Sequence, residues 1–239
     1  MTFVDTEEGH TAPRATSADI DRLRYIATTA TAKLFAQIAG GRIRCESEAT
    51  LQLHLGRIIA TVADLELVDS RETISIELEK PLADPNGSRG RIDIWFQITD
   101  RDGVEARCAV ELKFFKKARQ REPNNRYDVF SDIARLERCA DVADVGFMLV
   151  GTDHPHYATH PRYSENTQDF DFRDGRAYRS GSELVYRTER PYGSPITLEG
   201  DYQFTWTVLP SPPSFGYMLL EVAPQMVAAA PAAGDAEGE

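Results

Sequence analysis

Residues 91–115 read RIDIWFQITDRDGVEARCAVELKFF and predict two β-strands joined by a tight turn. The first strand is expected over residues 91–98 and the second over residues 105–115. Residues 100–103 (DRDG) lie between them, and Asp and Gly favour short turns because they tolerate positive φ. We therefore expect an antiparallel hairpin, around which the other elements of the chain are arranged.

Side-chain alternation divides this hairpin into an apolar and a polar face, because successive strand residues point to opposite sides of a sheet. The expected apolar face consists of Ile92, Ile94, Phe96 and Ile98 from the first strand and Val110, Leu112 and Phe114 from the second. On the other face, folding about residue 102 places Asp93 opposite residues 110–111, with a slip of one residue allowed. Directly opposed residues have Cβ atoms roughly 5 Å apart. Asp93 and Glu111 are therefore expected to be neighbours, with Lys113 one step along.

This trio of side chains has the chemistry of a metal site. Adjacent carboxylates raise each other's pKa unless a cation lies between them, and oxygen ligands suit a hard divalent ion such as Mg²⁺. An adjacent lysine can orient or deprotonate a water, or stabilise a negatively charged transition state. The bland alternative is a solvated face with a cross-strand Asp–Lys pair. Asp93 in register with Glu111 and Lys113 favours the metal site.

The composition predicts a globular protein of the reducing cytoplasm. With 239 residues, 41% of them hydrophobic, the chain is long enough for one domain with additional elements or for two small domains. It lacks a run of about 18 apolar residues, so no membrane helix is expected. The polar, acidic N-terminus is unlike a signal peptide. Three cysteines without CxxC spacing fit neither a disulfide framework nor a zinc site.

The net charge of −11 does not by itself favour nucleic-acid binding. Its distribution is uneven, because basic residues outnumber acidic ones over residues 105–126, directly after the candidate site. Four of these basic residues, which we call the basic link, are Lys116, Lys117, Arg119 and Arg121. They are expected to contact nucleic acid, with a solvated charged loop as the alternative.

Hydrophobic periodicity predicts the remaining elements. Helices are expected at residues 17–39, 48–63 and 126–143, and further strands at residues 73–80, 145–150, 202–209 and 217–222. Ser17 and Ser47 are the expected caps of the first two helices. Because the second hairpin strand is followed by a helix and another strand, these two strands should be parallel with a right-handed crossover.

Two helices carry further polar side chains of interest. Glu48 lies in the first turn of the second helix, where the helix dipole favours a carboxylate and a functional role is equally open. Glu46 is the alternative helical acid, and Gln52 lies one turn after Glu48 on the same face. In the third helix, Asp128, Asp132 and Arg135 are spaced so that acid–base pairs can form along the surface. The spacing of these three residues therefore predicts ion pairs on the exposed side of the helix.

The predicted organisation has four parts. Residues 1–16 form a disordered N-terminus and residues 17–150 the core. Residues 151–222 form a β-rich extension packed on that core, with two short strands expected between residues 169 and 186. Residues from 223 to 239 are Ala- and Pro-rich and are expected to be disordered.

The order helix, three-strand meander, helix, strand, with Asp93 on the second strand and Glu111-Leu112-Lys113 on the third, resembles the PD-(D/E)XK nuclease superfamily. The resemblance covers about residues 47–151 and places Glu48 where many members carry a helical acid. Ile92 stands where the name-giving pattern has Pro. The implied fold is a mixed-sheet α/β (α+β) fold with a restriction-endonuclease-like core, αβββαβ, and a β-rich C-terminal extension.

Membership implies a Mg²⁺-dependent endonuclease, with Mn²⁺ able to substitute, that hydrolyses DNA phosphodiester bonds in a restriction or defence, repair or mobile-element context. The resemblance implies that Asp93, Glu111 and the carbonyl of Leu112 hold the metal, with Glu48 contributing directly or through water. It also implies that Lys113 positions the attacking water.

Several alternatives stay open. The protein could be a non-enzymatic nuclease-fold subunit for DNA binding or assembly, or a metal-dependent hydrolase of a small phosphate ester or nucleotide. A closed pocket beside Asp93, in place of an open groove, favours the small-molecule hydrolase. RNA could replace DNA as the substrate, and a homodimer or a partner subunit is compatible with the sequence.

Overall fold

The computed structural model describes residues 15–82, 90–118, 121–154, 156–159, 164–209 and 214–225. Its helices are α1 (Ser17–Ala39), α2 (Glu48–Glu66), α3 (Glu122–Glu137) and α4 (His156–Thr159). Its strands are β1 (Thr73–Pro81), β2 (Arg91–Thr99), β3 (Glu105–Phe115), β4 (Val145–Thr152), β5 (Ala177–Tyr178), β6 (Glu183–Leu184), β7 (Ile196–Thr197), β8 (Tyr202–Gln203), β9 (Trp206–Leu209) and β10 (Phe215–Val222). The expected mixed α/β class is confirmed.

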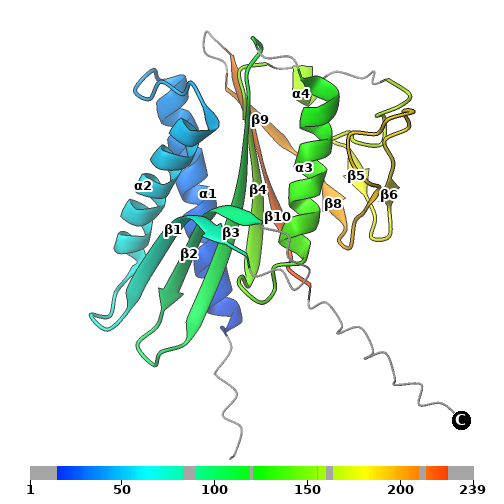
Figure 1. Cartoon of the computed structure of the whole chain (residues 1–239). Helices are drawn as coiled ribbons and strands as arrows, with labels where there is room; N and C mark the ends of the chain where they lie inside the picture. The colour runs from blue at the N-terminus through cyan, green and yellow to red at the C-terminus, as the bar shows by residue number, and fades with distance from the viewer. Residues whose placement is uncertain are drawn as a thin grey trace, which may run out of the picture.

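A six-stranded mixed sheet lies between two layers (Figure 1). Its strand order is β1-β2-β3-β4-β10-β9, with β3 and β4 parallel and the other neighbours antiparallel. Helices α1 and α2 cover one face. Helix α3 covers the other, together with the small two-stranded sheets β5-β8 and β6-β7. The predicted parallel pair across the α3 crossover is confirmed.

The central hairpin forms where the sequence predicts it. In the turn between β2 and β3, the Asp100 carboxylate accepts hydrogen bonds from the N–H groups of Asp102 and Val104, both at 2.8 Å. Gly103 follows with φ of 83°, a conformation that glycine adopts without steric cost. These contacts fix the turn and bring β3 alongside β2 with Trp95 opposite Ala109.

Helix boundaries follow local capping chemistry. Ser47 caps α2 by accepting a hydrogen bond from the N–H of Thr50, as predicted. The cap of α1 is Thr16 and not Ser17, because Thr16 and Asp19 form a reciprocal capping box. Helix α3 begins at Glu122, before the predicted residue 126, since Pro123 is tolerated in a first turn. It ends at Glu137, earlier than residue 143.

The chain after β4 differs from the expectation in one respect. The predicted strand at residues 202–209 is divided into β8, which pairs with β5, and β9, which joins the central sheet. Strand β10 pairs antiparallel with β4 and so brings β9 onto the same sheet. Residues beyond 151 therefore extend the central sheet as well as covering it. The two short strands expected between residues 169 and 186 are β5 and β6.

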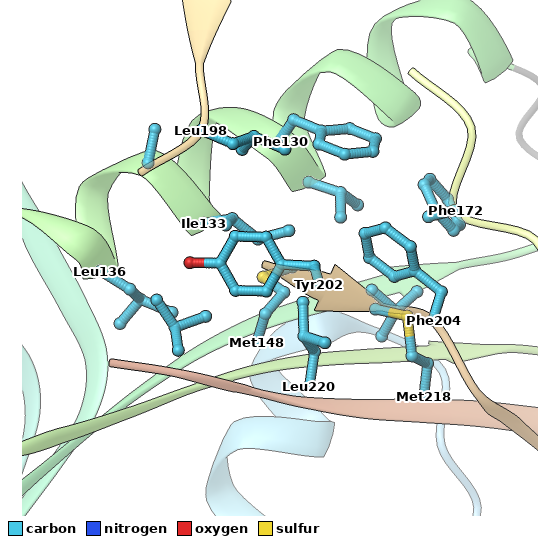
Figure 2. Packing of buried hydrophobic residues seen from close by; sticks show 14 of the residues in the cluster. Phe130, Ile133, Leu136, Met148, Phe172, Leu198, Tyr202, Phe204, Met218 and Leu220 are labelled. Atoms are coloured by element: carbon cyan, nitrogen blue, oxygen red, sulfur yellow. The ribbon is translucent and has the colours of Figure 1, made fainter. Parts of the chain in front are cut away.

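Two hydrophobic clusters occupy the two faces of the sheet. The cluster beneath α1 and α2 includes Leu34 and Leu51 and reaches Phe96 on β2. The cluster beneath α3 joins that helix to the C-terminal strands, as Figure 2 shows for Phe130, Ile133 and Leu136 packed against the C-terminal segment. Every residue of β4 is buried, as expected for a strand covered on both faces.

Some predictions fall on residues that the structure does not describe. These include the terminal segments 1–14 and 226–239, the turn at residues 83–89, Arg119 of the basic link, and residues 210–213. Among the described helices, none combines the length and apolar composition needed to cross a membrane.

Candidate active site

The side chains of Glu48, Asp93, Glu111 and Lys113 come together where the pairing of β2 with β3 ends, with Glu48 at the first residue of α2 and with Glu111 and Lys113 facing α3. Asp93 accepts a hydrogen bond through Oδ2 from the N–H of Leu112 at 2.6 Å, and Glu48 accepts one through Oε2 from the N–H of Phe114 at 3.2 Å. These N–H groups are two residues apart and point to the same edge of β3, so the two acids follow one another along that edge, before and after the position of Lys113.

Strand β2 changes faces at Asp93. Ile94 packs in the cluster facing α1 and α2, whereas Ile92 packs with Trp95 in the cluster facing α3. The prediction that Ile92 and Ile94 share one face is therefore wrong. The pairing of β2 with β3 also stops here, with Ile94 opposite Val110 as its last pair. Asp93 consequently uses its carboxylate, and not its backbone, to bond β3.

Strand β1 changes faces at the same level. Leu78 lies against α2, whereas the ammonium of Lys80 lies 3.8 Å from the ring centroid of Trp95, on the α3 side. Between them Glu79 has φ of 56°, a conformation that costs an L-residue roughly 1–2 kcal/mol. The pairing of β1 with β2 omits Glu79 and Asp93 but continues on both sides of them. Regular sheet geometry is thus interrupted at the candidate ligand.

Glu111 is buried on the α3 face and contacts a cation from that helix. Its side chain is 1% exposed, and its Oε1 accepts a hydrogen bond from Arg135 Nη1 at 2.7 Å. The carboxyl groups of Glu111 and Asp93 also interact, which by itself raises the pKa of Glu111 and lowers that of Asp93. Burial and the charge of Asp132 raise the pKa of Glu111, although Arg135 opposes the shift. The neutral form of Glu111 is therefore favoured relative to an exposed glutamate.

Lys113 is held as a cation by α3. Its Nζ lies 2.6 Å from Asp132 Oδ2 and donates a hydrogen bond of 3.1 Å to the carbonyl of Leu112. The contact with Asp132 is a buried ion pair. Burial lowers the pKa of Lys113, but Asp132 and Glu48 outweigh burial and leave this pKa raised. A lysine in this state donates hydrogen bonds and does not act as a base.

The remaining two acids are also disfavoured as carboxylates. Burial raises the pKa of Glu48, with a further contribution from Asp93 that Lys113 opposes. Burial likewise raises the pKa of Asp93, against the hydrogen bond from Leu112 and the charge of Lys113. A nearby cation stabilises the ionised form of carboxyl groups whose pKa is raised in this way.

The formal charges indicate what the cluster lacks. Its acids are Glu48, Asp93, Glu111 and Asp132, and its cations are Lys113 and Arg135. Four negative charges and two positive charges leave a formal charge of −2 when all are ionised. A single divalent cation balances that charge, and the donor set of carboxylates with the Leu112 carbonyl suits Mg²⁺ or Mn²⁺.

The acids are not arranged as a ready-made metal cage. Within the described ranges, no three His, Cys, Asp or Glu side chains form a group geometrically suited to a metal ion. Arg135 and Lys113 instead contact the carboxylates directly. The residues fit a divalent ion by charge and donor chemistry, with Asp93, Glu111 and the Leu112 carbonyl as the core set and Glu48 beside it.

Two residues of this cluster were predicted as surface residues. Asp132 is 3% exposed and bridges Lys113 and Arg135, the latter through Oδ1 at 2.8 Å. The expected pairing of Asp132 with Arg135 is therefore confirmed, but its expected exposure on the helix surface is wrong, because α3 packs its Asp132 side onto the sheet. The i, i+3 spacing of Asp132 and Arg135 was visible in the sequence, but the facing strand was not.

Gln52 was recognised only as a neighbour of Glu48. Its amide nitrogen donates to the carbonyl of Asp93 at 2.6 Å and to Glu79 Oε1 at 2.9 Å. Glu46, the alternative helical acid, is exposed and pairs with Arg44 and Lys116. Of these two acids, the structure brings Glu48 and not Glu46 to the cluster.

Three residues of the basic link, Lys116, Lys117 and Arg121, lie among the described residues that follow β3. Lys116 is engaged by Glu46, whereas Lys117 and Arg121 are exposed. The N–H of Lys117 donates to Asp153 Oδ1 at 2.6 Å, which fixes the chain after β3. Two of the three described cations are thus exposed to solvent.

Comparison of the chain with models of protein families, with curated proteins and with solved structures finds no match.

Proposed function

We propose that this protein is a Mg²⁺-dependent endonuclease that hydrolyses phosphodiester bonds of DNA, and that Mn²⁺ can replace Mg²⁺. The observation that carries the proposal is that Asp93 and Glu48 accept hydrogen bonds from Leu112 and Phe114, the residues that flank Lys113 on β3, in the strand that also carries Glu111. These residues come from three different elements, so their meeting depends on the fold and is not a property of one local motif.

The order of elements supports a restriction-endonuclease-like core. From α2 to β4 the chain runs helix, three antiparallel strands, helix and a strand parallel to β3. This is the αβββαβ order of the PD-(D/E)XK nucleases that the sequence resembles, and the acidic cluster lies on its central strands. The β-rich extension from residue 151 adds to that core.

Each residue of the cluster has its own role in the proposed hydrolysis. A divalent ion held by Asp93, Glu111 and the Leu112 carbonyl, with help from Glu48, would supply an activated water and neutralise charge on the phosphate. Lys113, kept charged by Asp132, donates hydrogen bonds to the water or to a phosphate oxygen as negative charge develops. Arg135 balances Glu111 before the ion binds.

Contact with the DNA backbone is assigned to the basic link. Lys117 and Arg121 are exposed near the cluster, and salt-dependent contacts of lysine and arginine with phosphates supply much of the affinity of proteins for DNA. In an acidic protein such a patch also orients the substrate toward the site. We propose the cytoplasm as the compartment and restriction, repair or mobile-element function as the context.

A cleavage assay tests this function. Purified protein is incubated with supercoiled plasmid and Mg²⁺, in parallel with EDTA and with the Asp93→Asn variant. We expect relaxed or linear products only from the wild type with Mg²⁺. Equal product formation by wild type and Asp93→Asn would point to a contaminating nuclease, and intact single- and double-stranded DNA and RNA in every lane would contradict the proposal.

A second function is favoured by one observation. The acids of the cluster already have cationic partners, Lys113 and Arg135, as expected of a nuclease fold that binds DNA or assembles with a partner without cleaving. The two functions differ in metal binding. A protein that binds DNA equally well with Mg²⁺ and EDTA, and that takes up no Mg²⁺ or Mn²⁺, would be the non-enzymatic subunit.

A further inference from the structure

We propose that Gln52 and the left-handed Glu79 form a positioning device that turns the Asp93 carboxylate toward β3, an inference that rests on the proposed metal-dependent function. Neither residue belongs to the candidate ligand set. Both lie at the level where β1 and β2 lose their regular pairing.

The first observation is that the backbone of Asp93 is released from both neighbouring strands. The pairs on either side of it in the β1–β2 ladder are Leu78 with Ile94 and Lys80 with Ile92, and the β2–β3 ladder ends at Ile94. A carbonyl that leaves a sheet must find another donor, because an unpaired buried acceptor is costly. Here that donor is a side chain.

Gln52 supplies this donor. Its Nε2 lies 2.6 Å from the Asp93 carbonyl oxygen and 2.9 Å from Glu79 Oε1, so one amide group connects α2, β1 and β2. The bond to the Asp93 carbonyl satisfies the peptide oxygen where the ladder is interrupted. The carboxylate of the same residue is then available to the N–H of Leu112 at 2.6 Å.

Glu79 supplies the backbone conformation that makes room for this arrangement. With φ of 56°, it is the one non-glycine residue with positive φ in the described part of the chain. A side chain in that conformation is disfavoured in a strand, and such residues concentrate at functional sites, where surrounding contacts hold them. The hydrogen bond from Gln52 to Glu79 is such a contact.

The device explains the exchange of faces on both strands. Leu78 and Ile94 lie on the side of α1 and α2, whereas Lys80 and Ile92 lie on the side of α3. A regular strand cannot make this exchange, since residues two apart point the same way. The irregularity at Glu79 and Asp93 therefore sets the direction of the Asp93 carboxylate relative to Glu111.

Substitutions separate the two parts of the device. Glu79→Gly keeps the left-handed backbone accessible without a side chain, whereas Glu79→Val makes it unfavourable, because β-branched residues rarely adopt positive φ. Gln52→Leu keeps the approximate side-chain size and removes both hydrogen bonds. Gln203→Leu, at an exposed position on β8, is the matched control for an amide-to-leucine change.

The readout is the affinity for Mn²⁺ measured by calorimetry, with the melting temperature measured on the same samples. We expect Gln52→Leu and Glu79→Val to weaken Mn²⁺ binding by at least 10-fold, as for other residues that orient metal ligands. The Mn²⁺ affinity of Glu79→Gly and of Gln203→Leu should stay within about twofold of the wild-type value. A change of that size is smaller than the loss expected when a residue that orients a metal ligand is removed. Loss of melting temperature alone, with unchanged Mn²⁺ affinity in Gln52→Leu and Glu79→Val, would show that these residues only stabilise the sheet.

The outcomes distinguish failure of the positioning role from failure of the proposed metal-dependent function. A wild type that binds Mn²⁺, with Gln52→Leu and Glu79→Val binding it equally well, overturns the positioning role and leaves the metal site intact. A wild type that binds no Mn²⁺ overturns both. If Glu79→Val does not fold, Gln52→Leu compared with Gln203→Leu decides the result, since both are amide-to-leucine changes.

Discussion

The two faces of the central sheet bury different kinds of side chain. Beneath α1 and α2 the buried cluster is apolar, with Leu34 and Phe96 among its members. Beneath α3 the sheet buries acids as well, including Glu111, Asp132 and Glu137. Burying a charge is costly unless it is paired and hydrogen-bonded. The α3 face therefore carries a cost that the face of α1 and α2 avoids.

The acids of the α3 face themselves divide into two groups. Glu137 accepts hydrogen bonds through Oε1 from the N–H groups of Glu199 and Gly200 and from the hydroxyl of Tyr202, at 2.7 to 2.9 Å. These neutral donors tie α3 to the C-terminal segment, which is a structural role. Glu111 and Asp132 instead pair with the cations Arg135 and Lys113, and their cluster has surplus negative charge. This difference is the reason why we propose the second group as the functional one.

The largest stability effect is expected from the face of α1 and α2. Leu34→Ala removes a fully buried side chain from α1. Because it leaves a cavity in an apolar cluster, it should lower the free energy of unfolding by about 2–5 kcal/mol. Urea denaturation measures this change. Cleavage by the folded fraction should match the wild type, and a selective loss of activity would show that the two faces are not independent.

Changes in the charged cluster should lower activity while leaving stability largely unchanged. Asp93→Asn, Glu111→Gln and Lys113→Ala should each lower DNA cleavage by roughly 100-fold or more, since each removes a ligand or a donor to developing charge. Steady-state cleavage of a labelled duplex measures the loss, and urea denaturation at pH 7 provides the stability control. A variant that lost stability in proportion to activity would have a structural and not a catalytic role.

Glu137→Gln tests the division among the buried acids. The amide keeps one acceptor oxygen but loses the charge that strengthens three hydrogen bonds. We expect a loss of about 1–3 kcal/mol in the free energy of unfolding, with unchanged metal affinity. Weakened Mg²⁺ binding in this variant, measured beside Glu111→Gln, would mean that the division between structural and functional acids is wrong.

Glu111 should also give the metal-free protein an unusual pH dependence. Burial and Asp132 raise its pKa in the folded state above the value of about 4.3 in an unfolded chain. Its contribution to stability is therefore fully present below the unfolded pKa and is lost as the pH rises through the folded pKa. The loss is at most about 1.4 kcal/mol per pH unit.

Denaturation in EDTA between pH 5 and pH 8 measures this effect. Stability of the wild type should fall relative to Glu111→Gln as the pH rises, because glutamine cannot ionise. Two parallel stability curves would show that Glu111 is ionised throughout, through its pairing with Arg135.

The smallest effect is expected at the edge of the cluster. Joint replacement of the exposed Lys117 and Arg121 by Ala should weaken DNA binding and reduce the slope of log affinity against log salt by about 1 per residue. Lys116→Ala should have less effect, since Glu46 already engages Lys116. A salt titration by fluorescence anisotropy measures the slope, and unchanged slopes would identify the basic link as ordinary solvated surface.

The same two faces differ in how far the sequence predicts them. Hydrophobic periodicity predicted helices α1 and α2, because it depends on local spacing alone. The alternation along β3 likewise placed Glu111 and Lys113 on one face. These predictions needed only the period of one element, and the cap at Ser47 needed only its immediate neighbours.

Features that depend on two or more elements were missed. A left-handed Glu79 has no sequence signal, since Gly or Asn is the usual residue with positive φ, and the face exchange of Ile92 follows from it. Burial of Asp132 depends on how α3 packs on β3, and the addition of β9 to the central sheet depends on β10. Such long-range contacts are not encoded in local periodicity.

Titration of the metal-free protein with Mg²⁺ by isothermal calorimetry tests most directly whether the surplus acids on the α3 face hold a divalent ion. Wild type and Lys113→Ala are compared with Asp93→Asn and Glu111→Gln under one buffer and salt condition. We predict saturable binding by the first two proteins and at least 10-fold weaker binding by the two carboxylate variants. Absence of saturable Mg²⁺ and Mn²⁺ binding by the wild type, or equal binding by all four proteins, would contradict the assignment of this cluster as a metal site.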